Sequence, residues 1–75
     1  MTTAEIVRER ALSLAEAGAP TDEAVNELLE SSGDRRVAVV LAEQELLAEL
    51  DASQSDVLSR AVELLDQVLE RMPSD

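Results

Sequence analysis

The sequence contains no cysteine, no histidine and no aromatic residue, and all six of its basic residues are arginines. Without cysteine the chain can form no disulfide, and without cysteine or histidine it lacks the usual ligands of zinc sites. Histidine, cysteine, lysine and tyrosine are also common catalytic bases and nucleophiles, so only carboxylates and hydroxyls remain for such roles. We therefore predict a protein that is not an enzyme, with no catalytic or metal-ligating residues and no cofactor.

Positive charge is also scarce, because seventeen carboxylates oppose the six arginines and give a formal net charge of −11. Such a charge repels nucleic-acid phosphates and anionic lipids, so we expect no direct contact with nucleic acid or membrane. It favours solubility and would steer the chain towards a basic protein. No apolar run approaches the roughly 18 residues needed to span a bilayer. Glu5 and Glu9 interrupt the N-terminal stretch where a signal peptide would be apolar, so we expect a cytoplasmic protein.

Four amphipathic stretches predict an all-α fold, a small bundle of three to four helices in a single domain over residues 1–75. We expect helices at about 3–17, 21–31, 34–50 and 55–72. Their ends are predicted from cap and stop residues, which are Thr2 with Glu5, Gly18, Thr21, Gly33, Asp34, Ser53 or Ser55, and Pro73.

The last predicted helix carries an apolar face that is too wide for one neighbouring helix to cover. The third predicted helix opens with "VAVVLA" at 37–42, which is apolar on every side. A chain of 75 residues does not comfortably enclose this much apolar surface, so we predict that homodimerisation through the third and fourth helices completes the bundle. A monomeric bundle is the alternative. The predicted self-association interface consists of Val40, Leu47, Leu58, Ala61, Leu65, Val68, Leu69 and Met72.

Two arginines stand in the first turn of the third predicted helix, where a cation opposes the helix dipole. These are Arg35 and Arg36, in the stretch "SSGDRR". Pairing with a nearby carboxylate would compensate, and the nearest are those of Glu27, Glu30 and Asp34. Alternatively, the two guanidinium groups, the serine hydroxyls and the helix N-terminus could hold an anion or contact a partner.

Acidic side chains gather on the second and third predicted helices. Rows of this kind are usually a solvated face, and the alternative is a docking surface for a basic protein. The residues concerned are Glu23, Glu27, Glu30, Glu43, Glu45 and Glu49.

The stretch "DASQSD" at 51–56 spaces its oxygen ligands like the start of a calcium loop, but Asp56 occupies the position that needs glycine. We therefore expect it to be a helix-capping turn.

Two partial resemblances to known families can be traced to particular residues. The stretch "RAVELLDQVLERMP" resembles the second helix of a tetratricopeptide repeat, with Ala61, Leu65 and Pro73 among the matching positions. In the preceding helix, Glu45 and Glu49 occupy the positions at which that family has an aromatic residue and a glycine. In size, acidity and helix count the chain is similar to acyl carrier proteins, but "SGDRR" stands where their Asp-Ser-Leu attachment site would be.

These observations predict an acidic, helical, non-enzymatic protein–protein interaction module, in the role of an adaptor, an inhibitor or an antitoxin-like regulator. Its expected partners are a second copy of itself and a basic protein. The sequence leaves two alternatives open. One is a carrier-like or small-molecule-binding bundle, and the other is an acidic nucleic-acid mimic that binds a basic protein.

Overall fold

Four helices linked by short turns make up the chain. The computed structural model describes residues 2–72, in which α1 spans Thr3–Ala17, α2 Thr21–Ser32, α3 Arg36–Ser53 and α4 Asp56–Arg71. No strand occurs within these residues, so the all-α prediction is confirmed. The largest difference from the expected ends is at the third helix, expected to stop at about residue 50 and found to stop at Ser53. The predicted stop at Pro73 lies outside the described residues.

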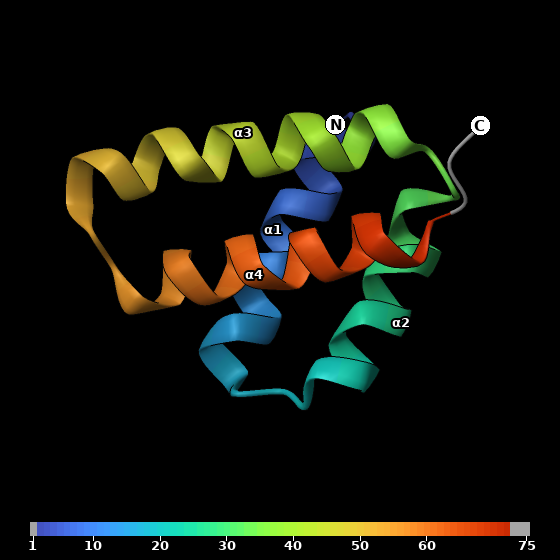
Figure 1. The fold of residues 1–75 in the computed structure, drawn as a ribbon, viewed down its shortest axis with the longest axis horizontal. Coiled ribbons are helices and arrows are strands. Elements are labelled where there is room, and N and C mark those ends of the chain that lie inside the picture. The colour runs from blue at the N-terminus through green and yellow to red at the C-terminus, as the bar shows by residue number, and fades with distance from the viewer. Residues whose placement is uncertain (1, 73–75) are drawn as a thin grey trace.

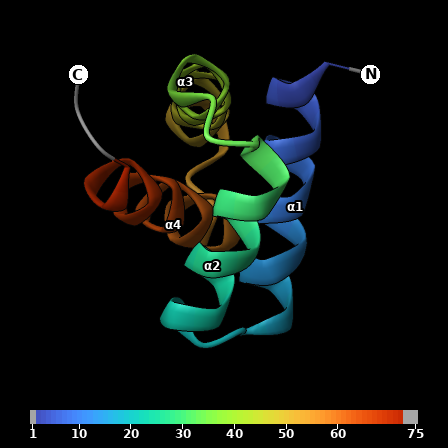
Figure 2. The same cartoon turned by 90° about the vertical axis from the view of Figure 1, so that its right-hand side faces the viewer.

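The helices form two antiparallel pairs that cross each other. α3 and α4 run in opposite directions along the longest axis, and α1 and α2 form the second pair, steeply inclined to the first (Figure 1). Seen from the end, α3 lies at the top of the bundle, above α4 and beside the start of α1 (Figure 2). α1 packs against all three other helices, whereas α2 contacts α1 and α4 and barely touches α3. One side of α3 therefore faces away from the bundle.

The predicted caps of the first helix are present. The Thr2 side chain accepts a hydrogen bond from the Glu5 backbone N–H at 3.2 Å, and its hydroxyl donates to the Glu5 carboxylate at 3.2 Å. The first of these bonds satisfies one of the backbone donors that a helix start leaves unpaired. Gly18 ends the helix in the left-handed conformation, with φ of 67°. Glycine adopts this conformation without the steric cost that other residues incur.

Two predicted N-caps are wrong. Asp34 was expected to begin α3, but it has a φ of 62°, directly after Gly33 with a φ of 58°. An N-cap residue needs an extended backbone. Arg35 has this conformation and is the N-cap residue, so the helix begins at Arg36. Thr21 is the first residue of α2, with Pro20 as its N-cap. The Thr21 hydroxyl instead accepts a hydrogen bond from Arg60 Nη2 at 2.8 Å, which links α2 to α4.

The core forms between the helices of one chain and contains alanine, valine, leucine and a single methionine. α4 contributes several of its largest members, including the fully buried Leu64 and Leu65. Alanines on all four helices allow the helix axes to approach closely. Within residues 2–72, no helix combines the length and apolar character required to cross a bilayer. The buried apolar set is Val7, Ala11, Ala24, Val25, Leu28, Ala38, Val39, Ala42, Leu46, Ala61, Val62, Leu64, Leu65, Val68 and Met72.

Two leucine truncations test this core. Leu65→Ala should lower the free energy of unfolding by about 3 kcal/mol, because it removes buried methyl groups and leaves a cavity. Leu47→Ala makes the same chemical change at a side chain that is 45% exposed, and it should cost less than about 1 kcal/mol. Urea unfolding of dilute protein, followed by far-ultraviolet circular dichroism, measures both. Equal losses would contradict the placement of Leu65.

Candidate functional site

The exposed large apolar side chains lie mainly on α3. Val37 is 71% exposed, Leu41 49% and Leu47 45%. Spacings of four residues from Val37 to Leu41 and of six from Leu41 to Leu47 place these side chains on one side of the helix, opposite the side that carries buried residues such as Leu46. Asp51, four residues after Leu47, lies on the same side and is charged. We call the set the α3 outer face, and it consists of Val37, Val40, Leu41, Gln44, Leu47 and Ala48.

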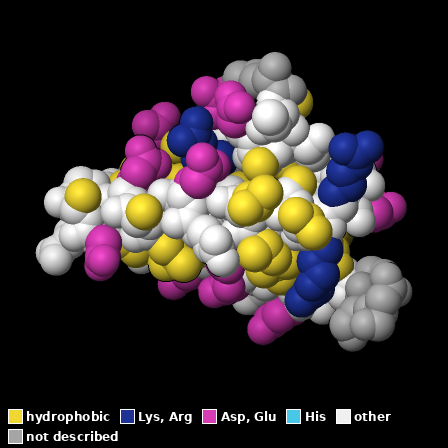
Figure 3. All heavy atoms as spheres, turned by 90° about the horizontal axis from the view of Figure 1, so that it is seen from above, with side chains coloured by type: hydrophobic (Ala, Val, Ile, Leu, Met, Phe, Trp, Pro, Cys, Tyr) yellow, Lys and Arg dark blue, Asp and Glu magenta, His cyan; other side chains and the backbone are white. Residues whose placement is uncertain are grey.

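Figure 3 looks down on the top of the bundle. Hydrophobic side chains are visible along this surface, and two basic groups border them at the right-hand end (Figure 3). An open hollow of about 620 Å³ adjoins the first turns of the α3 outer face. Its lining consists of Thr2–Ala4, Asp34–Ala38 and Leu41. The start of α1 thus forms one wall beside α3, and the hollow combines apolar lining with two arginines.

The arginine pair lies at the start of α3 as predicted, but without the expected ion pairs. Neither Arg35 nor Arg36 forms a salt bridge with any described residue. Arg36 Nη1 donates instead to the carbonyl oxygen of Leu69, at 3.3 Å, in the last turn of α4. A cation is favourable there because the C-terminal end of a helix is partly negative. Arg35 is left as an exposed cation in a strongly acidic chain.

The serine hydroxyls do not assemble an anion site with these arginines. The Ser31 hydroxyl donates to the carbonyl oxygen of Glu27 at 3.0 Å, and the Ser32 hydroxyl donates to that of Leu29 at 2.9 Å. The Ser32 side chain is fully buried. Both hydroxyl protons are therefore used within α2.

The predicted self-association residues are divided between the core and the surface. Ala61, Leu65, Val68 and Met72 are buried by the helices of their own chain. Val40, Leu58 and Leu69 are half-buried, and Leu47 is exposed. In this conformation a second copy can reach the α3 part of the predicted interface but not the buried part of α4. Homodimerisation itself stays a prediction.

The predicted acidic residues do not form one continuous face. Glu23, Glu27 and Glu30 lie on α2, whereas the others lie on α3, and the two helices barely touch. The carboxylate of Glu27 pairs with Arg10 of α1 at 2.9 Å. Glu45 and Glu49 are exposed in the second half of α3, at the opposite end of the bundle from α2 (Figure 1).

Glu43 differs from the other glutamates of α3, because it is half-buried beside Asp66 of α4. Burial, a hydrogen bond shared with Asp66 and repulsion from the Asp66 charge raise the pKa of Glu43 to about 7. Its Oε2 atom is buried and, in the charged form, has no hydrogen-bond partner among the described residues. Two carboxylates can only accept hydrogen bonds, so protonation of Glu43 supplies the missing donor. No spacing in the sequence indicates this pair, because its members lie on different helices.

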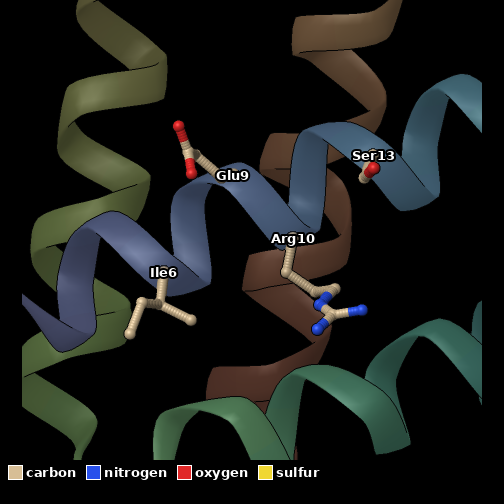
Figure 4. Close-up of a pocket in the computed structure, with 4 residues that line it drawn as sticks. All are labelled: Ile6, Glu9, Arg10 and Ser13. Atoms are coloured by element: carbon tan, nitrogen blue, oxygen red, sulfur yellow. The ribbon is translucent and has the colours of Figure 1, made fainter. Parts of the chain in front are cut away.

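Two further hollows have different linings. One of about 250 Å³ is lined by Ile6, Glu9, Arg10 and Ser13, all from α1. Arg10 points towards α2, where Glu27 binds it, and Glu9 points to the other side (Figure 4). A second, of about 390 Å³, is open and mostly polar, and it is lined by Thr21, Arg60, Glu63, Asp66, Gln67 and Glu70.

The calcium-like stretch does not form a loop. Asp51 and Ser53 belong to the last turn of α3, and Ser55 is the N-cap residue of α4. Its side chain makes no capping hydrogen bond, so Ser55 holds the predicted cap position but lacks the expected contact. Among residues 2–72, no group of three or more acidic side chains is placed to hold a metal ion.

The Glu43–Asp66 pair predicts a pH-dependent stability. The folded protein keeps the Glu43 proton up to a pH of about 7, whereas the unfolded chain releases it near the ordinary value of 4.5. The stabilisation is complete below that ordinary value and is lost as the pH rises through about 7. We expect a loss on the order of 2 kcal/mol, reduced from the full shift because the pair is partly solvated.

Glu43→Gln should remove this part of the pH dependence, because its amide donates to Asp66 at every pH. The variant should therefore be more stable than the unchanged protein at pH values of about 8. Urea unfolding at several pH values measures the difference between the two proteins, which cancels the contribution of the other carboxylates. Glu45→Gln, at an exposed position of the same helix, is the control. Parallel curves for Glu43→Gln and the unchanged protein would contradict the shared proton.

Comparisons with known proteins leave the function to be inferred from the residues themselves. No protein-family model, no curated protein and no solved structure matches the chain. The similarity of the last helix to a tetratricopeptide repeat helix therefore concerns that helix alone. The features that the chain offers to a partner are the α3 outer face, the adjoining hollow, the basic start of α3 and its acidic second half.

Proposed function

We propose that this protein is a non-enzymatic protein–protein interaction module, and that the α3 outer face is its binding surface. The observation that carries the proposal is the exposure of Val37, Leu41 and Leu47. These are three of the four large apolar side chains that are exposed among the described residues, the fourth being Ile6 on α1. Contiguous exposed apolar surface on a small soluble fold is typical of a protein interaction site.

The mode of binding is the packing of a partner helix along α3. Side chains that repeat every three to four residues fit between the side chains of a second helix, as in coiled coils and helix-in-groove complexes. Leu41 lies near the middle of the face and also lines the hollow beside α1, so it is the expected anchor. The surrounding negative charge selects against acidic partners and affects association rates more than affinity. An adaptor, an inhibitor or an antitoxin-like regulator would act through such a surface.

A structural role for Glu43 supports the non-enzymatic part of the proposal. A carboxyl group with a pKa near neutrality is a possible general acid or base. A catalytic group, however, must come within hydrogen-bond distance of the substrate. Glu43 Oε2 is buried, which favours a role in the contact between α3 and α4. The pair therefore acts on the stability of the α3–α4 contact.

Partner capture with two matched variants tests the proposed function. Leu41→Glu places a charge on the α3 outer face, and Ile6→Glu makes a comparable change at an exposed position on α1. Both variants add one negative charge, so they differ in position and not in net charge. We expect specific partners from an extract of the source cells to bind the unchanged protein and Ile6→Glu. Binding to Leu41→Glu should be at least about tenfold weaker, because docking would bury an unpaired carboxylate.

Quantitative mass spectrometry of the captured proteins measures this difference, and circular dichroism checks that both variants remain helical. An identical set of bound proteins for all three baits, together with equal self-association of the three chains, would overturn the assignment of the binding surface.

A further inference from the structure

We infer that the helix bound by the α3 outer face is α3 of a second copy of this chain, packed antiparallel about a two-fold axis near Gln44. The inference rests on the proposed function, because it uses the same surface and names the partner. It also replaces the interface expected from sequence, since the buried side chains of α4 take no part.

The apolar residues of the face are arranged suitably for pairing with themselves. In an antiparallel pair centred on Gln44, positions equally distant from the centre face each other. Leu41 then lies opposite Leu47 of the second copy, and Val40 lies opposite Ala48. Both contacts occur twice, once on each side of the axis. The spacing of three and four residues is the one that side-chain interdigitation between two helices requires.

The charges at the two ends of α3 favour the antiparallel orientation. Arg35 is exposed at the start of the helix, and Glu49 and Asp51 are exposed near its end. In the antiparallel pair, Asp51 of the second copy lies opposite Val37, two residues along the helix from Arg35. A parallel pair would instead place arginine near arginine and carboxylate near carboxylate. The face is thus complementary to itself in one orientation only.

A different partner would satisfy only one end of this surface. An acidic helix would match Arg35 but would be repelled at Asp51. A basic helix would match Asp51 but would be repelled at Arg35. Each copy carries a net charge of −11, and this general repulsion opposes dimerisation. At physiological ionic strength, repulsion between exposed charges more than about 8 Å apart is largely screened, so the local pairs at the helix ends set the orientation.

The position of α3 leaves room for a second copy. The helix lies at the top of the bundle, and the start of α1 reaches up beside it (Figure 2). The hollow of about 620 Å³ lies on this flank, next to Leu41. Leu47 of the second copy, which faces Leu41, would enter it. One helix face buries less than the roughly 800 Å² per partner of a stable complex, so we expect a reversible dimer with a dissociation constant of about 0.1 mM.

Opposite charge reversals test the end contacts. Arg35→Glu and Asp51→Arg should each weaken self-association about tenfold, because each dimer contains the Arg35–Asp51 charge pair twice. An equal mixture of the two variants should restore association, since a mixed dimer has opposite charges at both ends. Each change also improves the interaction of its helix end with the dipole, so neither variant should lose stability as a monomer. Sedimentation equilibrium up to millimolar concentration measures association, and urea unfolding of dilute samples measures stability.

Single cysteines test the orientation, because the chain has no cysteine of its own. Gln44→Cys should form a disulfide-linked dimer on mild oxidation. Val37→Cys should not, because the two copies of this position would lie about 20 Å apart, beyond the reach of a disulfide. A mixture of Val37→Cys and Asp51→Cys should form the crossed disulfide. Rapid cross-linking of Val37→Cys with itself would indicate a parallel pair and overturn the inference.

The outcomes separate this inference from the proposed function. A chain that remains monomeric at millimolar concentration, but loses captured partners in Leu41→Glu, would overturn the second copy as partner and leave the binding surface assigned. A monomeric chain whose captured partners are unchanged in Leu41→Glu would overturn both. Self-association that charge reversal does not weaken would overturn the antiparallel arrangement.

Discussion

The fold depends on covering the apolar side of α4. This helix carries a wide face of leucine and valine, and the chain has no aromatic side chain with which to cover it from one direction. The solution is to place α4 between the other helices, in contact with α1, α2 and α3. Leu64 and Leu65 can then both be fully buried although they point in different directions from the helix axis. The crossed arrangement of the two helix pairs follows from this requirement.

Covering α4 in this way determines what remains exposed. α3 provides one apolar side for the contact with α1 and α4, and its opening residues are apolar on the other side as well. Among residues 2–72, no further helix packs above it. The burial that stabilises the monomer is therefore separate from the surface available for binding. A substitution on the α3 outer face can change binding while the core stays intact, which makes the two roles separable by mutation.

The sequence was sufficient to predict the helices, because their periodicity and most of their ends are encoded locally. Thr2 and Gly18 are examples in which a residue and its neighbours within one turn determine the cap. The failures concern interactions between distant parts of the chain. The Thr21 hydroxyl binds Arg60 of α4 and does not cap α2. Asp34 follows Gly33 in the left-handed conformation and therefore cannot be the N-cap of α3. Periodicity also shows which side of α4 is apolar but not which helices cover it.

The same limit applies to the functional surface. Glu43, Glu45 and Glu49 look alike in the sequence, and only the position of α4 separates a half-buried member of a carboxyl pair from two solvated charges. Arg35 and Arg36 are also neighbours with different surroundings, since Arg36 binds the end of α4 and Arg35 does not. This difference has a physical consequence for recognition. A charge that is already used inside the fold contributes little to a partner, whereas an exposed charge beside an apolar face can select the orientation of whatever docks there. In this chain the apolar side chains supply the affinity, and the unequal ends of α3 determine its direction.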